Sequence, residues 1–348
     1  MSIDQLVKRI GPLDRDAMKK ALDRLNNLTK PPGSLGVLED LIIQLAGITG
    51  EVMAKVENKM VIVMAGDHGV VEEGVSIAPQ SVTPQMVHNF LNGGAGINVL
   101  SRCAGAQVKV VDVGVADPNL SDAKLISRKI RLGTANMTKG PAMSREEALQ
   151  AIKIGVEVAE DEINQGIKLL ATGEMGIGNT TPSSAILAVY SGAALSSIVG
   201  PGVGLDDNGV SNKTKAIERA LMVNKPDSAD PLDVLSKVGG LEIAGLTGVI
   251  LGSAARKVPV VIDGFISGAA ALVACKLAPQ VKDYIIASHL SEEPGHKIML
   301  ETLGLEPMLR MRMRLGEGTG AALAFNLVEA ATRIMSEMTT FEEAGVIM

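Results

Sequence analysis

Short apolar runs alternate with helical patterns along most of the chain. Five of these runs predict buried strands, at residues 60–64, 108–113, 168–171, 258–262 and 284–287. Strands that alternate with helices predict a mainly parallel sheet with helices on both of its faces. The pattern therefore predicts an α/β fold.

Small or polar residues follow each of the five runs. Examples are Asp67-His68-Gly69, Thr172-Gly173-Glu174 and Asp263-Gly264. Ligands of open α/β sheets bind outside the carboxyl ends of the strands. We therefore expect the residues that carry chemistry to gather at one edge of one sheet.

The two ends of the chain have a helical pattern. Residues 1–27 carry many charges and lack the apolar core of a secretion signal, so they predict an amphipathic helical pair. The turn residues of segment 30–36 predict a boundary near residue 30, and the longest predicted helix spans 319–335. The uncharged span 175–205 is long enough to cross a bilayer, but proline and glycine interrupt it, so we expect no membrane span.

Composition narrows the choice of partners. The 348 residues include 46% hydrophobic residues but only two Tyr, four Phe and no Trp, so an aromatic ligand is expected to lie against aliphatic and Met side chains. The net charge is −6 without a long basic tract, which argues against a nucleic-acid partner. Cys103 and Cys275 stand far apart and outside any CxxC motif, which favours a reduced, cytoplasmic protein.

Residues 172–182 combine a carboxylate, a glycine-rich turn and a helix start. Glu174 is followed by glycines at 176 and 178, and Thr181-Pro182 is a suitable N-cap and first-turn pair. Free backbone N–H groups at such a helix start favour an anion without a basic side chain. The segment predicts a phosphate site.

Two further glycine-rich segments carry candidate residues. Residues 200–207 form a second turn with Lys213 nearby, which suits a monophosphate, although two ordinary loops would have the same sequence pattern. In the other segment Glu317 lies between Gly316 and Gly318 ahead of the last long helix. A glutamate there often only complements the helix dipole, but the flanking glycines would give a flat molecule room to reach it.

The histidines give weak signals. Asp67-His68 could be a catalytic couple, a metal site or a simple turn cap, and His289 and His296 lack a third ligand at a suitable spacing. We expect no metal.

Ordered motifs along the whole chain resemble those of the nicotinate-nucleotide:dimethylbenzimidazole phosphoribosyltransferase family of cobalamin biosynthesis. These motifs are 31–36 (PPGSLG), 65–70 (AGDHGV), 73–76 (EGVS), 82–87 (VTPQMV), 173–181 (GEMGIGNTT), 200–202 (GPG), 263–265 (DGF), 288–296 (SHLSEEPGH) and 315–320 (LGEGTG). The resemblance implies transfer of phosphoribose from nicotinate mononucleotide to a benzimidazole nitrogen, which gives alpha-ribazole 5'-phosphate and nicotinate. It also implies a homodimer and no cofactor.

The fold implied by the resemblance is a Rossmann-like doubly wound domain, residues 31–291, with a small helical domain formed from both chain termini, residues 1–30 and 292–348. By resemblance Glu317 is the catalytic base and Glu174 a second carboxylate, which holds a hydroxyl or acts as an auxiliary base. The implied phosphate and ribose contacts are Gly176, Asn179, Thr180, Gly202, Gly204, Lys213, Asp263 and Ser291. The implied acceptor pocket consists of Ser76, Gln85, Met175 and Leu315.

Two other functions stay open from the residues. A nicotinamide-dependent oxidoreductase would fit the α/β pattern and Gly176-Ile177-Gly178. However, Thr181 stands where the dinucleotide-binding fingerprint has its third glycine, and no acidic residue occurs between Gly178 and Asp206. A ligand-sensing module without turnover is the other alternative. The acceptor also stays open among dimethylbenzimidazole, benzimidazole, adenine and a phenol, because aromatic residues are scarce.

Overall fold

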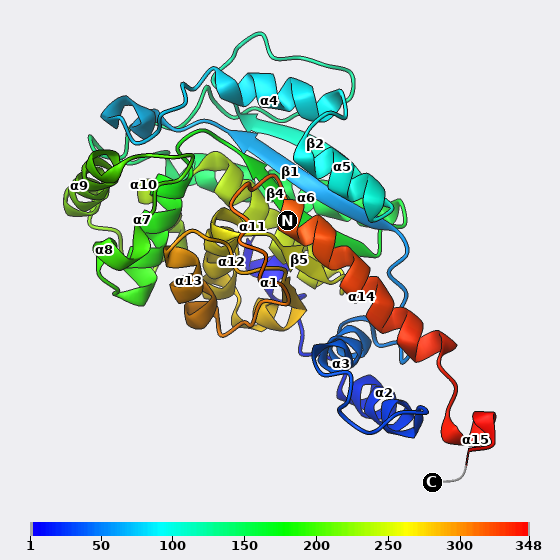
Figure 1. Cartoon of the computed structure of the whole chain (residues 1–348). Coiled ribbons are helices and arrows are strands. Elements are labelled where there is room, and N and C mark those ends of the chain that lie inside the picture. The colour runs from blue at the N-terminus through cyan, green and yellow to red at the C-terminus, as the bar shows by residue number, and fades with distance from the viewer. Residues whose placement is uncertain (1–2, 347–348) are drawn as a thin grey trace.

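A six-stranded parallel sheet forms the centre of the molecule (Figure 1). The computed structural model describes residues 3–346. The strands are β1 (Lys59–Gly66), β2 (Ala106–Gly114), β3 (Ile126–Ser127), β4 (Leu169–Met175), β5 (Val260–Ile262) and β6 (Ile285–Ala287). Their order is β3-β2-β1-β4-β5-β6, which is the order of a doubly wound Rossmann-type sheet. The predicted α/β fold and its five strands are confirmed, and only the two-residue β3 was not predicted.

Helices cover both faces of this sheet (Figure 1). They are α1 (Ile3–Val7), α2 (Arg15–Asn27), α3 (Val37–Thr49), α4 (Val82–Leu91), α5 (Gly96–Cys103), α6 (Arg145–Asn164), α7 (Thr180–Ser191), α8 (Leu195–Ile198), α9 (Asp207–Asn224), α10 (Pro231–Val238), α11 (Leu241–Ala255), α12 (Phe265–Leu277), α13 (Gly295–Leu303), α14 (Thr319–Glu337) and α15 (Phe341–Ala344), with the 3₁₀ turns η1 (Gly69–Glu73) and η2 (Pro279–Tyr284). No helix within residues 3–346 is long and apolar enough to cross a membrane.

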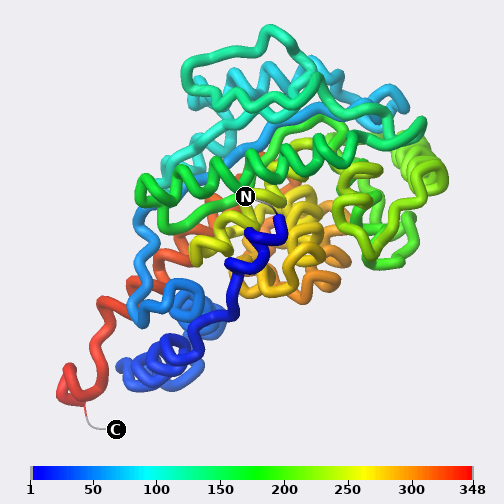
Figure 2. Tube along the Cα trace, turned by 180° about the vertical axis from the view of Figure 1, so that it is seen from behind, coloured from blue at the N-terminus to red at the C-terminus, as the bar shows by residue number. Residues whose placement is uncertain are grey.

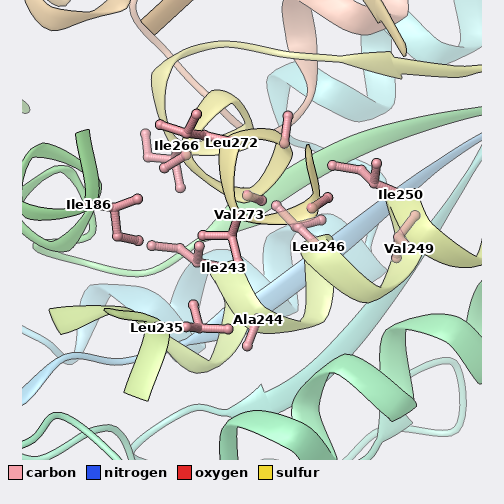
Figure 3. Close-up of a cluster of buried hydrophobic side chains, with 14 of the residues drawn as sticks. Ile186, Leu235, Ile243, Ala244, Leu246, Val249, Ile250, Ile266, Leu272 and Val273 are labelled. Atoms are coloured by element: carbon pink, nitrogen blue, oxygen red, sulfur yellow. The ribbon is translucent and has the colours of Figure 1, made fainter. Parts of the chain in front are cut away.

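Helix α11 is the centre of the larger hydrophobic core. All but its last residue are buried, as expected for a helix that is apolar on every side. It packs against α6, α12 and the strands β1 and β4, and Figure 3 shows Ile243, Leu246 and Ile250 among the side chains of this core. A Cβ at Gly155 of α6 would lie 1.9 Å from the Gly245 carbonyl oxygen, so glycine allows the two helices to touch through their backbones.

Helices from both ends of the chain lie together beside the sheet (Figures 1 and 2). Helix α2 packs on α3, α3 packs on α14, and an antiparallel bridge joins Leu28 to Thr340. This group includes α3, which lies outside the predicted terminal ranges 1–30 and 292–348. Two helices inside those ranges pack elsewhere, since α1 contacts α11 and α13 contacts α12. The cause is that burial of apolar faces, rather than position in the chain, decides where each helix packs.

Candidate active site

The candidate site lies where the strand order reverses, between β1 and β4. Met64 and Glu174 are neighbours in the register of this strand pair. A cleft of about 260 Å³ opens at the carboxyl end of β4. It is lined by Val75, Ser76, Ala78, Val82, Met86, Glu174, Met175, Ile177, Gly178, Asn179, Thr180, Gly202, Val203, Ile266, Glu293, Arg314, Leu315, Gly316 and Glu317. Ligands of doubly wound sheets bind at such a switch point.

Glu317 reaches the cleft through an unusual backbone conformation. The φ angles of Gly316, Glu317 and Gly318 are 83°, 64° and 96°, so three consecutive residues are left-handed. A non-glycine residue adopts this conformation only when its surroundings impose it. Here a Cβ at Gly318 would lie 2.6 Å from Val61, and one at Gly316 would lie 2.3 Å from a Glu174 carboxylate oxygen. The glycines predicted to clear space therefore bring the backbone of this segment against β1 and β4.

The Glu317 carboxylate is held at the start of another helix. Its Oε2 accepts a hydrogen bond of 3.0 Å from the Ile97 N–H in the first turn of α5. The helix dipole that this carboxylate complements is therefore that of α5. Burial raises the pKa of Glu317, hydrogen bonding from Ile97 opposes the shift, and Asp263 adds to it. A carboxylate with a raised pKa is a stronger base than one in water.

Glu174 is the second carboxylate of the cleft. It is buried in β4, and its Oε2 accepts a hydrogen bond from the Asn179 side chain. Burial, together with the negative charge of Asp263, raises the pKa of Glu174 to about 8. Glu174 is therefore largely protonated at neutral pH, although the hydrogen bonds from Asn179 and from the Glu317 backbone favour its charged form.

Asp263 organises the segment that carries Glu317. Its carboxylate accepts hydrogen bonds from the N–H groups of Gly318, Gly320 and Ala321 at 3.2, 2.8 and 3.1 Å. These are the orphan donors at the start of α14, so Asp263 caps this helix from the end of β5. The structure does not place Asp263 in the lining of the cleft, where a ribose or nicotinate contact was expected.

The predicted phosphate end contains a buried lysine. Lys213 of α9 donates from Nζ to Thr180 Oγ1 at 2.5 Å and to the Gly200 carbonyl oxygen at 3.2 Å. A Cβ at Gly202 would lie 3.5 Å from the same Nζ, so the two glycine-rich turns meet around this cation. Burial lowers the pKa of Lys213 to about 8, against the opposing influence of Glu293. A bound anion would favour the charged lysine.

Two charged residues of the lining were not predicted. Glu293 follows the predicted Ser291, and Arg314 donates at 3.5 Å to the Gly202 carbonyl oxygen. Glu293 lies in the motif 288–296, and Arg314 directly precedes the motif 315–320. Their proximity to Gly202 arises from the fold.

The predicted acceptor residues fall into two groups. Ser76, Met175 and Leu315 line the cleft, whereas Gln85 lies on the exposed side of α4 and does not. The neighbouring Met86 lines it instead. Together with Val75, Val82 and Ile177, these residues make this part of the cleft largely aliphatic.

Five predicted phosphate or ribose residues lie outside the lining: Asp263 and Lys213, described above, and Gly176, Gly204 and Ser291. Gly176 packs over Gly66, since a Cβ there would lie 2.2 Å from the Gly66 carbonyl oxygen. Gly204 follows the lining residues Gly202 and Val203 without joining them. Ser291 accepts a hydrogen bond from the Glu293 N–H and so supports the lining from behind. Asn179 and Thr180 do line the cleft.

The predicted N-cap at Thr181 is wrong. Helix α7 begins at Thr180, and Asn179 occupies the N-cap position without a side-chain cap. The Asn179 side chain donates through Nδ2 to Glu174, and its oxygen accepts no hydrogen bond from the helix start. Thr181 therefore lies inside the first turn.

The histidines have other partners than those considered from the sequence. His68 Nε2 lies 2.9 Å from Glu242 Oε1, whereas Asp67 accepts from the Thr83 hydroxyl and the Ala116 N–H. Asp67 and His68 therefore do not form a couple. Within residues 3–346, no group of three His, Cys, Asp or Glu side chains is arranged to hold a metal ion.

The fold and this cleft define the class of the protein. A doubly wound sheet with a cleft at its switch point, lined by two buried carboxylates, is the arrangement of an α/β enzyme that binds a small ligand. The model of a phosphoribosyltransferase family matches residues 10–346.

Relatives narrow this class further. The nicotinate-nucleotide–dimethylbenzimidazole phosphoribosyltransferase of Desulforudis audaxviator is 58% identical over 98% of this chain and 96% of its own length. The protein of that name from Geobacter sulfurreducens is 54% identical over 99% of this chain and 98% of its own. The crystal structure of the Thermus thermophilus enzyme superimposes with a TM-score of 0.91 at 46% identity, over 97% of this chain and 100% of that one. The chain belongs to the nicotinate-nucleotide–dimethylbenzimidazole phosphoribosyltransferase family. This membership argues against the two alternative functions, a nicotinamide-dependent oxidoreductase and a ligand-sensing module.

Proposed function

We propose that this enzyme transfers phosphoribose from nicotinate mononucleotide to 5,6-dimethylbenzimidazole or a related base. The products would be alpha-ribazole 5'-phosphate and nicotinate, in the assembly of the cobalamin nucleotide loop. The observation that supports this most directly is that Glu317, Thr180 and Gly202 line one cleft, and that the buried Lys213 donates to Thr180 and lies close to Gly202.

The reaction needs one base and no acid. The bond between the sugar carbon C1′ and the pyridinium nitrogen breaks, and its electron pair stays on that nitrogen, so nicotinate leaves with a neutral ring. A nitrogen of the acceptor bonds to C1′, and another ring nitrogen gives up its proton. Glu317 takes this proton, and its negative charge stabilises the positive charge that develops at C1′. Attack from the face opposite nicotinate turns a β-linked donor into an α-linked product.

The aliphatic part of the cleft suits a flat apolar acceptor. Val75, Val82 and Met86 line the same cleft as Glu317. Apolar contacts of this sort favour dimethylbenzimidazole over a more polar base, because every buried polar group of the base would need a partner. The phosphate of the donor binds at the other end, beside Thr180, Gly202 and Lys213.

The test is to incubate the protein with nicotinate mononucleotide and a panel of bases and to identify the products by mass. We expect an α-ribotide of dimethylbenzimidazole to form fastest. Glu317→Gln should lower kcat by about 10²–10⁴-fold, the usual contribution of a general base, with little change in donor binding. Unchanged turnover in this variant would refute the assigned base, and the absence of any ribotide would refute the reaction.

We also propose that the enzyme is a cytoplasmic homodimer, in which the terminal helices α2 and α14 form a small domain with α3. Exposed apolar side chains around the cleft, Ile77, Val203 and Leu315, support a partner surface, being 65%, 57% and 61% exposed. Both cysteines, Cys103 and Cys275, are free thiols, which fits a reducing compartment. Sedimentation equilibrium would test the dimer.

A further inference from the structure

Glu293 places a carboxylate at the end of the cleft that is proposed to bind a phosphate. It lines the cleft with Thr180, Gly202 and Arg314. The residue is only 8% exposed, and its Oε2 is buried without a hydrogen-bond partner among residues 3–346. Leaving a buried acceptor unpaired costs about 1–3 kcal/mol, more for a charged group. A carboxylate in this position therefore needs an explanation beyond stability.

The surroundings of Glu293 fix its position. Its N–H donates to Ser291 Oγ at 3.3 Å, and the Ser291 N–H donates to His296 Nδ1 at 2.8 Å. Burial lowers the pKa of His296 to about 3, so this imidazole stays neutral and keeps its acceptor. On the other side, a Cβ at Gly200 would lie 2.4 Å from Glu293 Oε2, so a glycine is needed there for the carboxylate to come so close.

Glu293 lies within electrostatic reach of two cations. Burial raises the pKa of Glu293, and the positive charges of Lys213 of α9 and Arg314, together with the Gly202 backbone, oppose this rise by favouring the charged carboxylate. Within residues 3–346, Lys213 and Glu293 do not form an ion pair with a distance below 4.0 Å. The Lys213 Nζ instead donates hydrogen bonds to Thr180 and to the Gly200 carbonyl oxygen. The carboxylate therefore acts on the lysine through space.

We propose that Glu293 is an internal counter-ion of the phosphate site, which balances Lys213 and Arg314 in the free enzyme and opposes the phosphate of a bound nucleotide. The inference rests on the proposed function, because it takes the donor phosphate to bind beside Thr180, Gly202 and Lys213. Donor and product carry the same 5′-phosphate. A site without this carboxylate would hold both more tightly, so Glu293 limits the affinity for the product as well as for the donor.

The experiment is a calorimetric titration of the full-length protein with inorganic phosphate at pH 8. Glu293→Gln keeps the shape of the side chain and removes its charge, so the Kd for phosphate should fall by about tenfold, equivalent to about 1.4 kcal/mol. The matched control is Glu292→Gln, which removes the same charge from an exposed position one residue earlier and should leave the Kd unchanged. Glu293→Ala also removes the charge, so its Kd for phosphate should fall as well. If one of the two variants does not fold, the other still tests the proposal.

A second ligand pair tests whether the effect acts on the phosphate itself. Nicotinate mononucleotide should bind Glu293→Gln more tightly than wild type, whereas nicotinate riboside, which lacks the phosphate, should bind both equally. Equal or weaker binding of phosphate by both Glu293 variants, or equal tightening for the riboside, would overturn the proposal. Binding is measured without turnover, so a failure of the proposed reaction would appear separately, as an absence of ribotide with the wild-type enzyme.

Discussion

Gly173 of β4 lies directly against the backbone of Glu317. A Cβ at position 173 would lie 2.3 Å from the Glu317 carbonyl oxygen, well inside any permitted contact. The Glu317 backbone is left-handed and lies between two left-handed glycines, so the segment has a defined path across the end of the sheet. The position of the base thus depends on the absence of a side chain in a neighbouring strand.

Gly173→Ala should therefore disturb catalysis more than binding. The added methyl group pushes the Glu317 segment away from β4, and a displacement of about 1 Å at a reacting group can cost about 10²-fold in rate. We expect kcat to fall by about this factor, while the KM for nicotinate mononucleotide changes little because Lys213 and Gly202 lie in other segments. Steady-state kinetics measures both constants.

Gly140→Ala is the matched control for this variant. No atom lies within 4 Å of a Cβ built at Gly140, and its φ angle is not positive. This variant should keep wild-type kinetics. If Gly173→Ala also keeps wild-type kcat, the contact with Glu317 does not position the base.

Asp263→Asn should loosen the same segment from the other side. An amide has one acceptor oxygen, so it cannot accept from the Gly318, Gly320 and Ala321 N–H groups as both carboxylate oxygens do. We expect a loss of about 1–3 kcal/mol in the free energy of unfolding, the usual cost of an unpaired buried polar group, together with a lower kcat. Urea denaturation and kinetics would measure the two effects.

Asp206→Asn provides the comparison for a carboxylate cap. Asp206 caps α9 by accepting from the Gly209 N–H in an exposed position, where asparagine caps equally well. The free energy of unfolding of Asp206→Asn should match that of the wild type. Equal stability of Asp263→Asn would show that the capping contacts of Asp263 do not hold α14 in place.

Most of the fold could be predicted from local patterns. The apolar runs at residues 60–64 and 108–113 are long enough to indicate buried strands, and their alternation with helices implies the parallel sheet. The two residues of β3 lack such a run, and their pairing with β2 depends on neighbours that the sequence does not show. Which terminal helices pack together also depends on contacts between distant segments, as the place of α3 beside α14 illustrates.

The site could be predicted only in part, for the same reason. Glu174 and Glu317 could be found because each lies in a glycine-rich segment, a signal that is local in the sequence. The cap that Asp263 forms and the approach of Glu293 to Gly200 join segments far apart in the chain. The N-cap at Thr181 was predicted wrongly because the helix already begins at Thr180, after an Asn179 whose side chain donates to Glu174 and forms no cap.

Glu174→Gln should make stability less dependent on pH. The pKa of Glu174 in the folded protein is about 8, above its ordinary value of 4.5, so the folded state favours its neutral form. A raised carboxyl pKa contributes stability in full below pH 4.5, and this contribution is lost as the pH rises to about 8. Each pKa unit corresponds to about 1.4 kcal/mol, so the loss in wild type amounts to several kcal/mol at most.

Glutamine does not titrate, and its amide oxygen can still accept from Asn179. The urea midpoint of Glu174→Gln relative to wild type should therefore rise between about pH 5 and about pH 8.5, a range that spans the titration of Glu174, while Glu292→Gln, at an exposed position, should show no such rise. A constant difference between Glu174→Gln and wild type over this range would mean that Glu174 is already charged at neutral pH, and it would then be a second base available beside Glu317.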